Sequence, residues 1–169
     1  MNPSEPGIQS PPTLSPLQRD QLLACARKLL QASVSGDPWR PLRGRNLGLL
    51  CEQGVSEGAE LFRAACSELG ARVATIQPSL DWCKAPQEVV TQTAQVLGRL
   101  YDAIECQGLA PELVAQLGAA AGVPVFDRIA LPGTLSEELA GRIDPALPAD
   151  TSRRYLLEAA ILGALGLGG

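Results

Sequence analysis

Apolar residues recur along this chain at spacings that predict alternating helices and strands. Residues 14–32 place leucine or alanine at helical intervals, which predicts one amphipathic helix with Ser15 as its cap and Pro16 in its first turn. Residues 33–45 carry two prolines and two glycines, a composition typical of a loop. Residues 46–52 form a short and almost continuous apolar run, which predicts a strand covered on both faces.

The alternation continues through the rest of the chain. The pattern predicts, in order, a helix over 61–69 that ends at Gly70, a strand over 72–77, a helix over 87–100, a strand over 103–107, a helix over 111–121, a strand over 123–127, and two last helices over 134–142 and 151–165. Strands interleaved with helices favour right-handed crossovers and a parallel sheet. We therefore predict an α/β fold, a three-layer sandwich with a four-stranded parallel sheet flanked by helices.

Composition sets the size of the unit. A chain of 169 residues with 46 % hydrophobic residues can bury one core, so we expect a single domain over residues 14–169. Residues 1–13 have neither the basic nor the apolar region of a signal peptide, and they predict a disordered leader. No uninterrupted apolar run of about 18 residues occurs, so we expect no transmembrane helix and predict a cytoplasmic protein.

Charge and missing residue types exclude several function classes. The 14 lysines and arginines against 18 aspartates and glutamates give a net charge of -4, so we expect neither nucleic acid nor a membrane as a partner. Histidine is absent, which excludes Ser-His-Asp and Cys-His catalysis and histidine-ligated metals.

The cysteines carry little further chemistry. There are five of them, and no two form a CxxC pair, so we expect neither a disulfide scaffold nor a zinc ribbon. We interpret them as reduced and mostly buried side chains, and we predict no metal and no cofactor. Cys51 and Cys106 lie near predicted strand ends, and the sequence leaves open whether either thiol is reactive.

The turn between the first strand and its helix is the best place for a ligand, because parallel α/β sheets bind ligands at the carboxyl ends of their strands. Its glycines match neither GxGxxG nor the phosphate loop GxxxxGK[ST]. Glu52, Glu57 and Glu60 surround the helix start, where carboxylates satisfy the helix dipole and repel a phosphate. The residues alone favour a plain helix start stabilised by acidic side chains.

Three separated segments resemble one enzyme family. LRGRNLGLLCEQGVSEGAELFRAACSELGARV, over 42–73, resembles the first βαβ unit of the ornithine and aspartate carbamoyltransferases. TAQVLGRLYDAIECQG, over 93–108, and AGVPVFDRI, over 121–129, resemble the third strand and the entry to the fourth in the ornithine branch. The resemblance implies a carbamoyl-phosphate domain over 14–143. Residues 150–166 resemble the family's last helix, which returns to pack on that domain, and the amino-acid-binding domain between the two is missing.

The resemblance implies a degenerate active site. The family's Ser-Thr-Arg-Thr-Arg motif, which holds carbamoyl phosphate, corresponds here to Val55, Ser56, Glu57, Gly58 and Ala59. Only Ser56 keeps a hydroxyl, Glu57 replaces a phosphate-binding arginine, and Gln107 replaces the arginine that follows the third strand. The His-Pro-Thr-Gln motif cannot exist in a chain without histidine. The anion-binding candidates are therefore Val55, Ser56, Glu57, Gly58 and Gln107, and we assign no catalytic residue.

The loop after the second strand offers one further candidate. In the family this loop reaches into a neighbouring subunit's site, which implies a contribution in trans from Ser79 and Lys84; the alternative is a solvated lysine in a surface loop. We expect a non-catalytic carbamoyltransferase-like protein that acts as a homo-oligomer, a trimer by resemblance, or beside a full-length transcarbamylase. The alternative is residual binding of carbamoyl phosphate or another small anion, as a sensor or as part of a composite enzyme. Independent carbamoyltransferase activity is the least favoured hypothesis.

Overall fold

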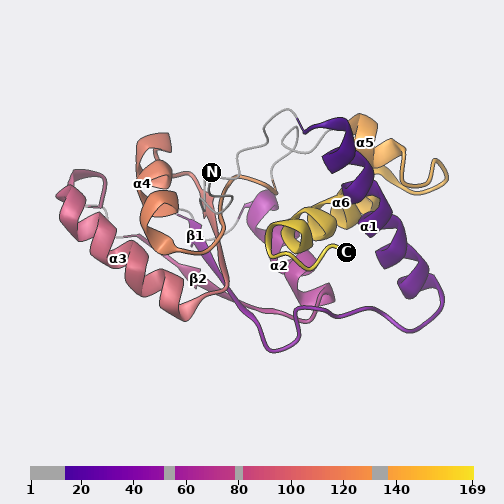
Figure 1. Cartoon of the computed structure of the whole chain (residues 1–169), viewed down its shortest axis with the longest axis horizontal. Helices are drawn as coiled ribbons and strands as arrows, with labels where there is room; N and C mark the ends of the chain where they lie inside the picture. The colour runs from indigo at the N-terminus through magenta and orange to yellow at the C-terminus, as the bar shows by residue number, and fades with distance from the viewer. Residues whose placement is uncertain (1–13, 52–55, 79–81, 131–136) are drawn as a thin grey trace.

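The computed structural model of this chain describes residues 14–51, 56–78, 82–130 and 137–169 (Figure 1). The leader predicted over residues 1–13 lies outside the described residues.

A parallel sheet lies at the centre of the fold. Its strands are β1 (Asn46–Cys51), β2 (Arg72–Ile76), β3 (Ala103–Gln107) and β4 (Val125–Asp127). They form one four-stranded sheet in the order β2-β1-β3-β4, and every neighbouring pair is parallel. The first strand therefore lies inside the sheet, between β2 and β3.

Helices cover both faces of this sheet (Figure 1). One face carries α1 (Pro16–Val34), α2 (Glu57–Glu68), α5 (Glu137–Gly141) and α6 (Ala149–Ala164). The other carries α3 (Gln87–Leu100) and α4 (Pro111–Ala121), and a short 3-10 turn, η1 (Trp82–Lys84), precedes α3. This arrangement confirms the predicted three-layer α/β sandwich.

Alternate residues of the central strands enter two separate cores. Leu47 and Leu49 of β1 pack in the core beneath α1, α2 and α6, whereas Leu50 packs in the core beneath α3 and α4. All five residues of β3 are buried. Strand β2 differs because it lies at the edge of the sheet, and three of its five residues are exposed.

Local chemistry explains the start of α1 and the end of α4. The Ser15 side chain accepts a hydrogen bond from the Gln18 amide at 3.2 Å, while Gln18 Oε1 accepts one from the Ser15 amide at 2.9 Å, so the predicted cap is a complete capping box. Gly122 ends α4 with a φ of 71°, a left-handed conformation that glycine adopts without strain.

Several element bounds differ from the sequence prediction by one to four residues, and the bounds of β4 and α5 are two examples. The fourth strand begins at Val125 rather than at residue 123, because the left-handed Gly122 and the missing N–H of Pro124 delay strand pairing. The helix predicted over 134–142 is observed as α5 (Glu137–Gly141), and residues 134–136 lie outside the described residues.

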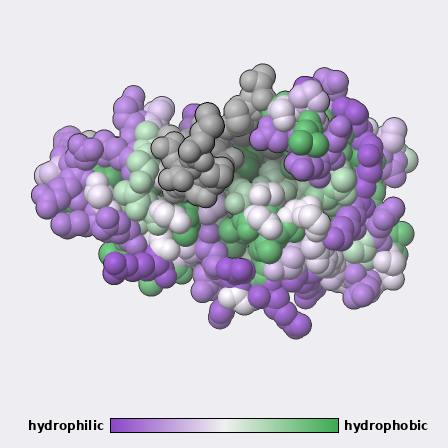
Figure 2. Space-filling view, viewed as in Figure 1, coloured by the Kyte–Doolittle hydropathy of each residue, from purple (hydrophilic) through white to green (hydrophobic). Residues whose placement is uncertain are grey.

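The last helix closes the fold against the first. Helix α6 packs on α1, α2 and α5, and its buried side chains include Tyr155, Leu156 and Leu157. Arg27 of α1 donates hydrogen bonds to the carbonyls of Arg142, at 2.6 Å, and Ile143, at 3.4 Å. Figure 2 shows hydrophilic residues at both ends of the molecule and hydrophobic ones gathered at its middle, over α2 and α6. No helix in the described part of the chain is long and apolar enough to cross a membrane.

Candidate functional site

The carboxyl ends of β1 and β3 lie side by side, and the helices that follow these two strands lie on opposite faces of the sheet. Cys51 at the end of β1 is in register with Gln107 at the end of β3. Helix α2, which follows β1, lies on one face of the sheet, and α4, which follows β3, lies on the other. This is the topological switch point at which open α/β sheets bind ligands.

Ser56 stands at the N-terminus of α2 and uses its hydroxyl twice. Its Oγ accepts a hydrogen bond from the Ala59 amide at 3.0 Å, which makes Ser56 the cap of α2. The same hydroxyl donates a hydrogen bond to Gln107 Oε1 at 2.9 Å. The one proton of this hydroxyl is therefore committed to Gln107.

Gln107 continues the network into the core. Its Nε2 donates to Glu105 Oε1 at 3.2 Å, and the other oxygen of Glu105 accepts from the Ile129 amide at 3.3 Å. Gln107 is 6 % exposed and Glu105 is fully buried. The network thus joins the start of α2, the end of β3 and the segment that follows β4.

Glu105 is a buried acid at the end of this network. Burial raises the pKa of its carboxyl to about 8, because the surrounding protein solvates the charged form poorly. Hydrogen bonds from Gln107 and from the Ile129 and Ala130 amides oppose that rise, and the nearby Asp127 adds to it. Near pH 7 the neutral acid predominates, so the site gains little charge from Glu105 itself.

The charged side chains around the network do not form an anion site of the usual kind. Glu57 and Glu60 lie in the first turn of α2, where their carboxylates compensate the helix dipole. Arg128, which follows β4, pairs with Asp127 at 2.9 Å between Nε and Oδ1. An incoming anion would meet carboxylates at the helix start and an arginine already engaged with an acid.

The structure brings together only part of the predicted site. Ser56 and Gln107 are in direct contact, and Glu57 and Gly58 follow in the first turn of α2, Glu57 exposed and Gly58 buried. Lys84 is an exposed residue of η1. Val55 and Ser79 lie outside the described residues.

Sequence reasoning missed Glu105, the most buried polar member of the network. A carboxylate in the middle of the predicted strand over 103–107 was the signal available, because a charged residue in a strand covered on both faces needs a partner.

The thiols near the site are buried. Cys51 is 2 % exposed and Cys106 is not exposed at all, and burial raises the pKa of the Cys106 thiol. Cys25, Cys51, Cys66 and Cys106 are all free. Within the described ranges no group of three or more cysteine, aspartate or glutamate side chains converges as a metal site would require.

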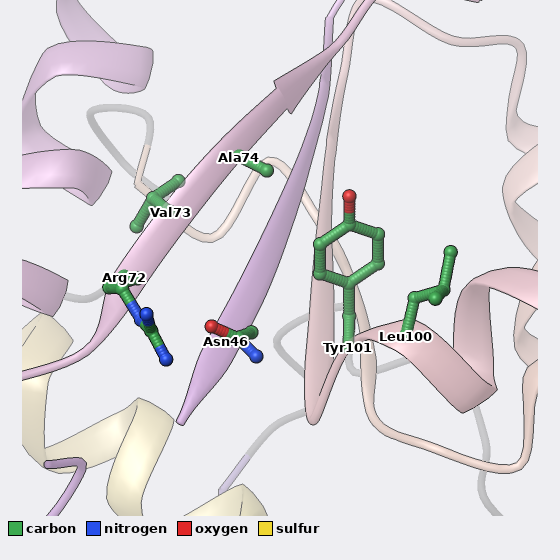
Figure 3. A pocket seen from close by; sticks show the side chains of 6 residues that line it. All are labelled: Asn46, Arg72, Val73, Ala74, Leu100 and Tyr101. Atoms are coloured by element: carbon green, nitrogen blue, oxygen red, sulfur yellow. The ribbon is translucent and has the colours of Figure 1, made fainter. Parts of the chain in front are cut away.

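A hollow of about 240 Å³ lies at the opposite, amino-terminal ends of the strands, beside the starts of β1 and β2 (Figure 3). It is lined by Asn46, Arg72, Val73, Ala74, Leu100 and Tyr101. Beside it, Arg45 pairs with Asp102 at 2.6 Å, and the Asn46 amide donates to the same carboxylate at 2.9 Å. Burial alone would raise the pKa of Asp102, but these two partners hold it below its usual value. These contacts of Asp102 hold the starts of β1 and β3 together, at the end of the sheet opposite to the Ser56–Gln107 contact.

The fold and the network define the class of protein: a parallel α/β domain with a helix N-terminus and polar side chains at its switch point. No family model matches this chain. The catabolic ornithine carbamoyltransferase of Chromobacterium violaceum is 38 % identical over 114 residues, which are 67 % of this chain and 34 % of that enzyme. The catabolic ornithine carbamoyltransferase of Pseudomonas putida is 38 % identical over 63 % of this chain and 31 % of its own length.

Solved structures share the fold. The ornithine carbamoyltransferase of Pyrococcus furiosus has a TM-score of 0.57 at 24 % identity, covering 66 % of this chain and 35 % of that one. The catalytic subunit of M. jannaschii aspartate transcarbamoylase has a TM-score of 0.62 at 19 % identity, covering 79 % of this chain and 44 % of that one. This chain belongs to the ornithine and aspartate carbamoyltransferase family. It spans about a third of the length of the curated relatives that it matches.

Proposed function

We propose that this chain is a carbamoyltransferase relative that does not transfer carbamoyl groups and acts through association, with copies of itself or with a full-length carbamoyltransferase. On this proposal residues 14–143 correspond to the carbamoyl-phosphate domain and residues 150–166 to the family's returning last helix. The packing of α6 on α1 and α2 supports the second assignment. That the protein acts in the cytoplasm, and that a trimer forms, stay predictions.

The hydrogen-bond network from Ser56 through Gln107 to Glu105 carries this proposal. At the positions that the resemblance assigns to phosphate binding, the chain has a hydroxyl engaged with its neighbours, a neutral amide and an exposed carboxylate, Glu57. An arginine offers a bidentate and permanently charged fork to a phosphate, whereas glutamine offers neither charge nor fork. Glu57 stands where the family has a phosphate-binding arginine, so an anion at this position would meet a negative charge in place of a positive one.

Residual anion binding is the second candidate. It is supported by the N-terminus of α2, whose dipole and free N–H groups attract anions, and by the Ser56 hydroxyl beside them. Glu57 and Glu60 in the same turn oppose it. The two candidates differ in one measurable property, which is the affinity of the chain for carbamoyl phosphate.

Two measurements on the purified chain test the proposal. In an assay of citrulline formation from ornithine and carbamoyl phosphate, with the Chromobacterium violaceum enzyme as the positive control, we expect no turnover above background. In calorimetric titrations with millimolar carbamoyl phosphate or inorganic phosphate, we expect no heat of binding. Turnover would overturn the non-catalytic assignment. Binding that Ser56→Ala abolishes would favour the second candidate instead.

A further inference from the structure

The hollow at the amino-terminal ends of the strands has no part in the proposed function. It lies between the edge strand β2 and the end of α3. Three of its lining residues carry polar side chains, which are the guanidinium of Arg72, the amide of Asn46 and the phenol of Tyr101. The other three are aliphatic, and none of the six is acidic. Drug-sized ligands occupy pockets of about 300–1,000 Å³, so a hollow of about 240 Å³ suits a smaller molecule.

The sheet places two of these polar side chains next to each other on one face. Residues two positions apart in a strand point to the same face. Arg72 therefore shares the face of Ile76, and Asn46 shares the face of Leu50, which is the face covered by α3 and α4. Asn46 and Arg72 are also in register across β1 and β2. Their side chains thus leave the sheet side by side.

Small residues between these strands and α3 leave the space open. Gly48 follows Asn46 on the same face, and an added Cβ there would lie 3.2 Å from the Tyr101 ring. The ring therefore lies directly over the strand at Gly48. Ala74 occupies the corresponding place on β2 and is exposed, as is Leu100 at the end of α3. The floor and wall of the hollow are accordingly apolar and reachable from solvent.

The polar groups of the hollow are uncommitted. Within the described ranges, the side chains of Arg72, Asn46 and Tyr101 make no hydrogen bond or ion pair with another residue. Arg45, beside the hollow, differs because it is paired with Asp102 at 2.6 Å. Figure 3 shows the side chains of Arg72 and Asn46 reaching toward each other, with the Tyr101 ring on the far side of Asn46. A cation and an amide thus meet at one end of an apolar hollow.

We infer that this hollow binds a small carboxylate that carries an apolar tail. The guanidinium of Arg72 pairs with both carboxylate oxygens through its planar fork, and the Asn46 amide donates to one of them. The tail lies on the Tyr101 ring and on the side chains of Ala74 and Leu100. This site is independent of the proposed function, because it lies at the opposite end of the sheet from the carboxyl ends of β1 and β3.

The end of α3 favours a carboxylate over a phosphate. Helix α3 runs from Gln87 to Leu100, so its carboxyl end, which carries a partial negative charge, borders the hollow. A dianion is repelled by that charge about twice as strongly as a monoanion. One guanidinium fork also matches the two oxygens of a planar carboxylate, and the aliphatic lining gives no further donor for a third oxygen.

Calorimetric titration of the purified chain with phenylacetate tests this site. We expect saturable binding with a dissociation constant on the order of 1 mM, because the ligand is small and the hollow is open to solvent. The neutral analogue phenylacetamide should bind at least about tenfold more weakly, since it lacks the charge that pairs with Arg72. Acetate, which lacks the tail, should also bind at least about tenfold more weakly.

Two variants test the assigned contacts. Arg72→Gln should raise the dissociation constant for phenylacetate at least about tenfold, because it removes both the charge and the fork. Arg19→Gln is the matched control, since it removes the same charge from an exposed side chain of α1, and it should leave the affinity unchanged. Ala74→Leu should abolish binding by filling the hollow. Arg72 and Ala74 are both exposed, so we expect these variants to fold, and circular dichroism establishes it.

Two-dimensional NMR places the ligand on the chain. Phenylacetate should shift the side-chain amide signal of Asn46 and the backbone amide signal of Ala74, and it should leave the amide of Ala59 at the start of α2 unchanged. Acetyl-leucyl-phenylalanine, with a free or an amidated carboxyl end, distinguishes the two natural sources of such a carboxylate. Tighter binding of the free peptide than of phenylacetate indicates the carboxyl terminus of a peptide, and weaker binding indicates a free acid.

Four results would overturn the site. They are no saturable binding of phenylacetate at millimolar concentration, equal affinity for phenylacetamide, tighter binding of inorganic phosphate, and unchanged affinity in Arg72→Gln. Each of them leaves the proposed function as it stands, because that proposal is tested by citrulline formation and by carbamoyl phosphate binding at Ser56. Turnover of ornithine would in turn overturn the proposed function and leave the carboxylate site intact.

Discussion

Two buried glutamates on the same side of the sheet have opposite surroundings. Glu105 in the middle of β3 accepts hydrogen bonds from the Gln107 side chain and from the Ile129 amide. Glu158 of α6 is 2 % exposed, and its Oε1 accepts no hydrogen bond from any residue that the structure describes; Arg154 Nε lies 3.7 Å away. Burial raises the pKa of both carboxyls, to about 8 for Glu105 and to about 7 for Glu158.

The difference between them separates two reasons for burying an acid. Glu105 organises three segments of chain, so its removal leaves donors without acceptors. Glu158 organises nothing of that kind in the described part of the chain, although Arg154 lowers its pKa and Glu68 raises it again. A buried polar group that accepts several hydrogen bonds is costly to remove, and one that lacks them is costly to keep.

The largest effect is expected from Glu105→Leu. This substitution removes both acceptor oxygens, so the Gln107 side-chain amide and the Ile129 and Ala130 backbone amides are left without this acceptor. Each unsatisfied donor costs about 1–3 kcal/mol, so we expect the free energy of unfolding to fall by about 3 kcal/mol. Urea denaturation at pH 7 measures it.

Glu105→Gln is the control for this prediction, because its amide oxygen can still accept a hydrogen bond from some of these donors. It should cost less than half as much as the leucine variant. Equal losses from both variants would mean that the network does not stabilise this end of the sheet.

The network also marks what the sequence could not predict. The bounds of β3 and α4 agree with the sequence prediction, because Pro111 and Gly122 mark the ends of α4 and β3 lies between Asp102 and Gly108. Contact between Ser56 and Gln107 depends instead on β1 lying beside β3 with Cys51 opposite Gln107. That adjacency is a property of sheet order, and no local pattern contains it. The burial of Glu158, whose Oε1 accepts no hydrogen bond from the described residues, was equally hidden, because burial of one helix face depends on which helices pack there.

A smaller effect, of opposite sign, is expected from Glu158→Leu. The folded-state pKa of Glu158, about 7, lies above the ordinary value of 4.5, so the folded protein holds this proton more tightly than the unfolded chain does. The stability that this proton contributes is fully present below pH 4.5 and is lost as the pH rises through 7. Removing the carboxyl should therefore stabilise the protein by about 2 kcal/mol at pH 8 and by little near pH 5.

Thermal unfolding of the wild type and of Glu158→Leu between pH 5 and pH 8 measures this difference. The pH dependence of stability also reflects the titratable and charged groups that interact with Glu158, which are Cys25 from α1, Cys66 and Glu68 from α2, and Arg154 from its own helix. A variant that is less stable than the wild type at pH 8 would show that Glu158 has a favourable partner after all.

The smallest effect distinguishes the two serine caps. Ser56 and Ser15 each cap a helix, but Ser56 also donates to Gln107, whereas Ser15 completes a local capping box with Gln18. Ser15→Ala should cost about 1 kcal/mol, the ordinary value of an N-cap, and Ser56→Ala should cost about 1 kcal/mol more because Gln107 loses a donor. Urea denaturation of both variants provides the comparison. Equal losses would mean that the Ser56 hydroxyl acts only as a cap. The Ser56 hydroxyl would then not be hydrogen-bonded to Gln107, and it would be available to a ligand at the start of α2.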